Sequence, residues 1–133
     1  MASDKDLIEC AVQASKRAYA PYSRFHVGAA LEVESGEVIS GCNVENASFG
    51  LTNCAERTAI FSAVAQGYRT FRRMALFVDH NDFFFPCGAC RQVLLEMAPD
   101  MEILVVKGDR SVARVVVRDM LPSPFSPKQL SGR

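Results

Sequence analysis

Short apolar segments alternate along this chain with segments whose apolar residues recur at helical spacing, and this alternation limits the folds open to it. In chain order the expected elements are a helix that Ser3 caps and Pro21 ends, strands over Phe25 to Glu34 and Val38 to Val44, a helix over 53–66, a strand over Met74 to Val78, a helix over Gly88 to Met97, and strands over Glu102 to Lys107 and Val112 to Val117. Strands interleaved with helices predict an α/β fold, a three-layer α/β/α sandwich around a mixed five-stranded sheet.

The connections narrow the topology further. Ser35-Gly36 predicts a hairpin turn, so we expect the first two strands to be antiparallel. Right-handed crossovers are expected to link the later strands. The tail from Leu121 contains three prolines and is expected to cross the surface with one short helical turn.

Length and charge limit the classes of function. The 133 residues fit a single domain over 1–133, because neither a repeat nor a linker interrupts them. Fifteen basic residues balance fifteen acidic ones, which argues against a nucleic-acid polymer as partner. No apolar run approaches the ~18 residues that a membrane span needs. The charged residues among 1–6 are untypical of a signal peptide, so a cytoplasmic location is expected.

Three of the five cysteines stand in two patterns that suggest a metal centre. Cys54 belongs to Cys54-Ala55-Glu56, and the other two belong to Pro86-Cys87-Gly88-Ala89-Cys90. Both patterns stand at the start of an expected helix. Three thiolates from two helix N-termini could converge on one Zn²⁺ and leave the fourth tetrahedral position for water, which is the arrangement of a catalytic zinc site.

The residues around these cysteines fit that interpretation. Three thiolates on a dication leave a net charge of −1, which helix N-termini would partly offset. Arg57 and Arg91 each follow a site residue directly and could donate charge and hydrogen bonds to the sulfurs. Glu56, two residues from Cys54, could take a proton from the zinc water and pass it to a substrate nitrogen.

Two alternatives remain open for the Cys-x-x-Cys pair, namely a closed structural zinc site and a redox pair. A closed site needs a fourth ligand, and the candidates are Cys10, Cys42, His26 and His80, none of which has ligand-like spacing. We expect the two cysteines to be buried apolar residues and the two histidines to be ordinary surface residues. The basic run Arg69, Arg72 and Arg73 is expected to be a solvated loop.

Several separated motifs resemble one family. They are Pro21-Tyr22-Ser23-x-Phe25-x-Val27-Gly28-Ala29-Ala30, Gly41-Cys42-Asn43-Val44-Glu45-Asn46-Ala47, Cys54-Ala55-Glu56-Arg57-Thr58-Ala59, Pro86-Cys87-Gly88-Ala89-Cys90-Arg91-Gln92 and Leu121-Pro122-x-x-Phe125. Together they span about residues 19–125 and resemble the short, three-cysteine cytidine deaminases. Phe49 and Ser48 depart from that pattern, since many relatives have tyrosine and cysteine there.

The resemblance implies roles for five further residues. Asn43 and Glu45 would hold the ribose hydroxyls, and the backbone of Ala55 would contact the base. Phe25 would pack against the pyrimidine. Phe125 would reach into the site of a neighbouring subunit, which implies a homotetramer with shared active sites. From the residues alone, Asn43 and Glu45 fit a polar hairpin end better, whereas Phe25 could as well be a core residue and Phe125 a cover for the core edge.

The resemblance also implies a reaction. It is the zinc-dependent hydrolytic deamination of cytidine and deoxycytidine to uridine and deoxyuridine, with one zinc per chain and release of ammonia, as in pyrimidine salvage. Glu56 would be the catalytic acid and base, and the partner a small-molecule nucleoside. The alternatives are a deaminase of a related cytosine compound such as blasticidin S and a non-catalytic, zinc-stabilised scaffold.

Overall fold

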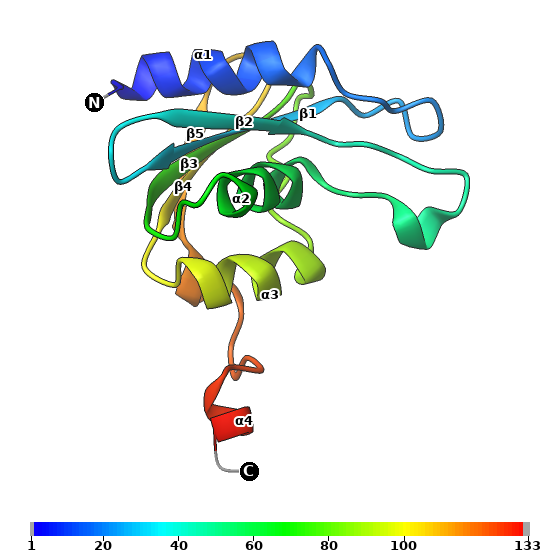
Figure 1. Cartoon of the computed structure of the whole chain (residues 1–133). Coiled ribbons are helices and arrows are strands. Elements are labelled where there is room, and N and C mark those ends of the chain that lie inside the picture. The colour runs from blue at the N-terminus through cyan, green and yellow to red at the C-terminus, as the bar shows by residue number, and fades with distance from the viewer. Residues whose placement is uncertain (1, 132–133) are drawn as a thin grey trace.

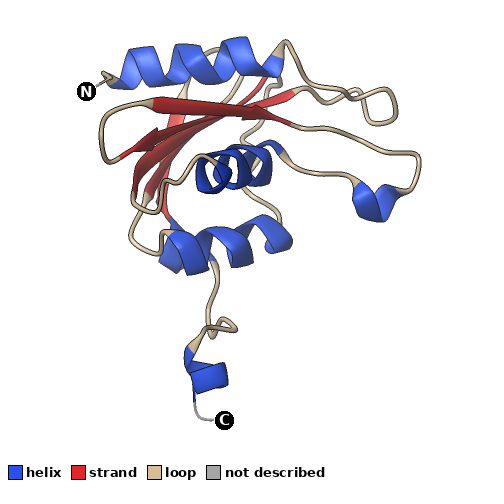
Figure 2. Ribbon diagram, viewed as in Figure 1, coloured by secondary structure: helices blue, strands red, loops and turns tan. Residues whose placement is uncertain are grey.

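A five-stranded mixed sheet lies between one helix on one face and two helices on the other, as the sequence predicts (Figures 1 and 2). The structure is a computed structural model that describes residues 2–131. The elements are α1 (Asp4–Ser15), β1 (Val27–Val33), β2 (Val38–Cys42), η1 (Phe49–Leu51), α2 (Ala55–Ala65), β3 (Phe71–Val78), α3 (Gly88–Met97), β4 (Glu102–Val106), β5 (Val112–Val116), η2 (Val117–Met120) and α4 (Lys128–Ser131).

The strand order is β2-β1-β3-β4-β5. β1 is antiparallel to both β2 and β3, so β2 and β3 run in the same direction and α2 connects them across β1. β3 and β4 are parallel and are connected by α3. β4 and β5 form an antiparallel pair, which corrects the expectation of a crossover at that point. Residues 107–111 alone join these two strands, and a parallel connection needs roughly a dozen residues or more.

Alternate residues of the central strands feed two cores. Ala30, Ala75 and Leu104 pack beneath α1. Their neighbours in the strands pack beneath α2 and α3, as Leu31 and Ile103 do. Burial on both faces explains why residues 74–78 of β3 and 103–106 of β4 are continuous apolar runs. α1 approaches β1 so closely that a Cβ atom on Gly28 would lie 1.9 Å from the carbonyl oxygen of Ala11.

The basic run is the predicted solvated loop only at Arg69, which is exposed before β3 begins. Arg72 and Arg73 lie within β3, which begins three residues before the predicted strand. The Nε atom of Arg73 lies 3.1 Å from a carboxylate oxygen of Glu32, which is only 2% exposed. Asp4 at the start of α1 also pairs with Arg73. The arginine therefore neutralises a buried acid and ties α1 to the sheet.

Besides the loop between α1 and β1, two segments extend away from the layered body (Figure 1). One includes residues 43–53 and has η1 near its tip. The other is the tail from Leu121 to α4, which contains the predicted short helical turn but extends away from the body instead of crossing its surface. Within residues 2–131, the helices are all too short, or too polar, to cross a membrane.

Candidate functional site

The three predicted thiols meet at the end of the molecule where α2 and α3 begin. Cys54 is the N-cap of α2, Cys87 is the N-cap of α3, and Cys90 lies in the first turn of α3. The Sγ atom of Cys87 lies 3.8 Å from that of Cys54 and 3.4 Å from that of Cys90, and all three lie within 4.8 Å of one another. Zinc–sulfur bonds of ~2.3 Å in a tetrahedron place sulfurs about 3.8 Å apart, so the three thiols fit one zinc ion.

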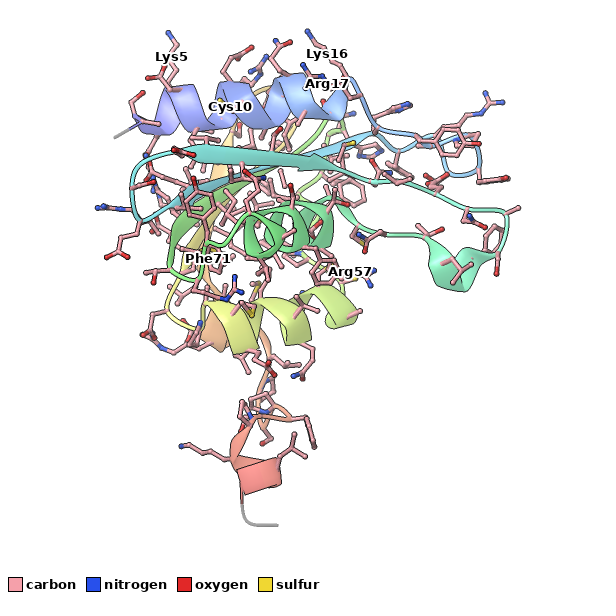
Figure 3. The ribbon with its side chains drawn as sticks, in the orientation of Figure 1. Lys5, Cys10, Lys16, Arg17, Arg57 and Phe71 are labelled. Atoms are coloured by element: carbon pink, nitrogen blue, oxygen red, sulfur yellow. The ribbon has the colours of Figure 1, made fainter. Side chains whose placement is uncertain are left out.

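Hydrogen bonds and a neighbouring cation prepare the sulfurs for a metal. The pKa of Cys54 is lowered to about 5, first by a hydrogen bond from the Cys90 thiol, and further by Arg57. Arg57 Nη2 donates to Cys54 Sγ at 3.4 Å, and Figure 3 shows Arg57 near the start of α2 and α3. Sharing the proton of Cys90 raises the pKa of that thiol. The thiol of Cys54 is therefore a thiolate at neutral pH even without a metal ion.

Glu56 is a buried carboxyl group beside the sulfurs. It lies in the first turn of α2, and only 4% of it is exposed. Burial raises its pKa to about 7, with the negative charge of Cys54 as a smaller cause in the same direction. A carboxyl group that titrates near neutral pH can both accept and donate a proton, as a general acid and base must.

Arg91 does not reach the sulfurs as predicted. Its Nε atom donates to the carbonyl oxygen of Pro86 at 2.7 Å, and its Nη1 atom donates to that of Met120 at 2.9 Å. Backbone carbonyls satisfy these donors on either side of α3. The side chain consequently braces the segment that leads into Cys87 and attaches it to η2.

A cavity of about 240 Å³ opens beside the thiols and brings together most of the predicted site residues. Its lining includes Asn43, Glu45 and Ala55 together with Cys54, Glu56 and Cys87. Phe84 and Phe85 also line it and were missed from the sequence, although the run of three phenylalanines directly before Pro86 was a usable signal. A larger hollow of about 600 Å³ on the α1 side contains none of the thiols.

Asn43 and Glu45 are buried and hold the loop that contains Phe25. Asn43 Oδ1 accepts from the amide of Val27 at 2.9 Å, and its Nδ2 donates to the carbonyl of Phe25 at 2.7 Å. Glu45 Oε1 accepts from the amide of Tyr22 at 3.0 Å. Hydrogen bonds to the carboxylate of Glu45 lower its pKa. The hydroxyl of Ser23 is the largest cause, followed by the backbone amide of Ser23, so the carboxylate is ionised at neutral pH.

The two aromatic residues predicted to contact substrate are both outside the core. Phe25 is 42% exposed, and its ring lies 5.4 Å from that of Phe84 between centroids. Phe125 is 57% exposed and lies in the extending tail, where its carbonyl oxygen accepts from Gln92 Nε2 at 2.7 Å. Neither residue is a buried core residue or a cover for the core edge.

In the described part of the chain, no fourth His, Cys, Asp or Glu side chain joins the thiol cluster. Among residues 2–131, Cys54, Cys87 and Cys90 form the only group of three or more metal-binding side chains within ligand distance of one another. Cys10 and Cys42 are half-buried elsewhere, which corrects the expectation that they are fully buried. His26 is exposed as expected, whereas the His80 ring also packs against Phe25.

Residues 1–106 match the family model of the "Cytidine and deoxycytidylate deaminase zinc-binding region". The chain belongs to this deaminase family. It is 45% identical to a cytidine deaminase of Halalkalibacterium halodurans, over 94% of this chain and 96% of the relative. A crystal structure of cytidine deaminase from Burkholderia pseudomallei superimposes with a TM-score of 0.90 at 48% identity, covering 93% of this chain and 100% of that one.

A third relative has lower sequence identity to this chain. Blasticidin-S deaminase of Bacillus cereus is 30% identical over 92% of each chain. Membership of the deaminase family confirms the resemblance and the fold class, and a zinc-binding family region together with the three-thiol cluster agrees with one zinc per chain.

Proposed function

We propose that this protein catalyses the hydrolytic deamination of cytidine and deoxycytidine to uridine and deoxyuridine, with release of ammonia. The observation that favours this most is the placement of Glu56, a buried carboxyl group beside three convergent thiols at the wall of a cavity. A purely structural zinc site has no use for a buried acid at that position, which argues against the scaffold alternative.

Cys54, Cys87 and Cys90 are the proposed ligands of the zinc ion. When bound, zinc supplies Lewis-acid chemistry that lowers the pKa of water and makes hydroxide available at neutral pH. Arg57 offsets the negative charge of the thiolates through its contact with Cys54. The positive ends of α2 and α3 act in the same direction.

Glu56 is the proposed proton carrier. Its carboxylate accepts the proton that the attacking water loses and delivers it to ring N3 of the pyrimidine. Protonation of N3 makes C4 more electrophilic, so that the C4–O bond can form. Glu56 then moves the second water proton to the exocyclic nitrogen, the C4–N bond breaks, and ammonia leaves. One carboxyl group that titrates near pH 7 can perform both transfers.

The rest of the cavity is proposed to bind the nucleoside. Asn43 and Glu45 offer an amide and a carboxylate to the sugar hydroxyls, and the backbone of Ala55 contacts the base. Phe25 packs against the pyrimidine ring. All but Phe25 line the same cavity, and Phe25 packs against Phe84, which does line it.

The decisive test incubates zinc-loaded protein with cytidine and measures the decrease in cytidine absorbance and the release of ammonia. Glu56→Gln protein is measured in parallel. We expect the wild type alone to convert cytidine. The variant should keep its zinc and lose at least about 10³-fold in kcat, because it cannot accept a proton. Conversion at the wild-type rate by Glu56→Gln would refute the assigned acid and base.

Blasticidin S is the alternative substrate, because one relative is named for its deamination. The sequence identity to that relative is 30%, compared with 45% to a cytidine deaminase. We therefore expect a higher kcat/KM for cytidine. The same assay with both compounds decides between them, and a higher kcat/KM for blasticidin S would reverse the assignment.

We also propose a homotetramer in which subunits share their sites. Phe49 is 76% exposed near the tip of one extending segment, and Phe125 is exposed in the other. Neither is covered by its own chain, and Phe125 is absent from the lining of the cavity. Light scattering after gel filtration should give four times the 14.6 kDa of one chain. Mixing inactive Glu56→Gln with Phe125→Ala protein should restore activity if Phe125 acts across subunits, and an unchanged rate would contradict the sharing.

A further inference from the structure

The hydroxyl group of Ser23 joins two residues of the nucleoside site. Its hydrogen is donated to Oε2 of Glu45, and its oxygen accepts the amide hydrogen of Phe25 at 3.0 Å. We propose that Ser23 is a positioning residue, which couples the carboxylate of Glu45 to the backbone that holds the ring of Phe25. The inference rests on the proposed function, since it assigns Glu45 to the sugar and Phe25 to the base.

The hydrogen bonds that Glu45 accepts within the chain determine which acceptor positions of its carboxylate remain for a substrate. Oε1 accepts two amide hydrogens, from Tyr22 at 3.0 Å and from Ser23 at 3.1 Å, and Oε2 accepts the Ser23 hydroxyl. A carboxylate has about four acceptor positions, so three are used within the chain. The remaining position on Oε2 can accept one sugar hydroxyl. Ser23 thus sets both the orientation of the carboxylate and the direction of its free lone pair.

The loop needs this brace because the core does not hold it. All residues of 21–26 are exposed, and Arg24 has a left-handed backbone with φ of 63°. Such a conformation is unfavourable for a non-glycine residue and persists only where the surroundings impose it. The loop is held by Glu45, by Asn43 and by a backbone bond from Arg24 to Ala20. Removing one hydroxyl would therefore loosen Glu45 and Phe25 together, although Glu45 keeps its two backbone amide bonds and the Phe25 carbonyl keeps its bond to Asn43.

The first arm of the test is steady-state kinetics of zinc-loaded protein with cytidine. Ser23→Ala should raise KM about 5–20-fold, because it removes a hydrogen bond to a charged group at a position that water can partly fill. kcat should change less than about threefold, since Ser23 is bonded to neither Glu56 nor a thiol. Ser23→Thr, which keeps the hydroxyl, should restore KM to within about twofold. Ser40→Ala, at an exposed serine of β2, is the matched control and should behave as the wild type.

The second arm asks whether Ser23 acts through Glu45. In a Glu45→Ala background, Ser23→Ala should change kcat/KM less than about twofold, because the shared interaction is already lost. A general loss of structure would lower kcat/KM equally in both backgrounds. Equal losses, a failure of Ser23→Thr to restore KM, or a wild-type KM in Ser23→Ala would each overturn the proposal.

The third arm does not depend on turnover. Hydrogen exchange of the Phe25 amide, measured by NMR without substrate, should be at least about fivefold faster in Ser23→Ala than in the wild type and in Ser40→Ala. Unchanged exchange would refute the brace itself. If the wild type fails to convert cytidine while exchange responds as expected, the proposed function fails and the brace stands.

Discussion

Replacing Glu56 with glutamine should make the protein more stable at alkaline pH while abolishing turnover. Burial raises the pKa of Glu56 from an ordinary 4.5 to about 7. The unfolded chain therefore ionises this group before the folded chain does, so the free energy of unfolding falls as pH rises from 4.5 to 7. At ~1.4 kcal/mol for each tenfold change in proton affinity, the loss reaches about 3 kcal/mol above pH 8. Glutamine has no charge to bury.

We expect the direction of this shift to persist with zinc bound. Burial is the first cause of the raised pKa of Glu56 and does not depend on the metal, and three thiolates on one dication still carry a net charge of −1 beside it.

The assay is urea unfolding of the zinc-loaded wild type and of Glu56→Gln, at pH 5 and at pH 8. The two proteins should differ by less than about 1 kcal/mol at pH 5, and the variant should be more stable by about 3 kcal/mol at pH 8. The control is Glu96→Gln, at an exposed glutamate near the C-terminal end of α3, which should behave as the wild type at both pH values. An advantage of equal size at both pH values would refute ionisation of Glu56 as its cause.

Three further changes have defined outcomes. Cys87→Ala should reduce bound zinc from one per chain to near zero by atomic absorption, and retention of one zinc would disprove its role as a ligand. Gly28→Ala should lower the free energy of unfolding by about 3 kcal/mol or more, because the added Cβ meets the Ala11 carbonyl oxygen, and a cost below 1 kcal/mol would contradict the close approach. Arg73→Met should cost about 3 kcal/mol in urea unfolding by leaving Glu32 buried without its main cation, whereas Arg72→Met, at an exposed arginine, should cost under 1 kcal/mol.

The element order was predictable because strands buried on both faces and helices with separate caps leave clear local patterns. Ser3 caps α1 as expected, by accepting the amide hydrogen of Asp6. The start of β3 was missed because Arg72 and Arg73 resemble a solvated loop by charge alone. Their place in a strand depends on Glu32, which is 41 positions away from Arg73 and buried on the same face. Such long-range compensation leaves no local signal.

The convergence of the three thiols was predictable for a different reason. Each thiol lies at a helix start that the sequence itself marks, and the structure brings those two helix starts together at one end of the sheet. The contacts of Arg57 and Arg91 were harder to predict, because both arginines directly follow residues of the candidate site and so have the same spacing. Helical rotation directs Arg57 to Cys54, and it directs Arg91 to two backbone carbonyls instead. Spacing alone does not distinguish these two outcomes.

The site combines groups that oppose one another electrostatically. A buried carboxyl group and the sulfur cluster lie side by side: the thiolate of Cys54 raises the pKa of Glu56, and Glu56 raises the pKa of Cys90. Arg57 and two helix N-termini offset the sulfurs, but burial leaves Glu56 with a pKa near 7. The same burial and repulsion that lower the stability of the folded chain at neutral pH hold the pKa of Glu56 near 7, where a carboxyl group can both accept and release a proton. The cost in stability is consequently inseparable from the ability of this carboxyl group to transfer a proton in both directions.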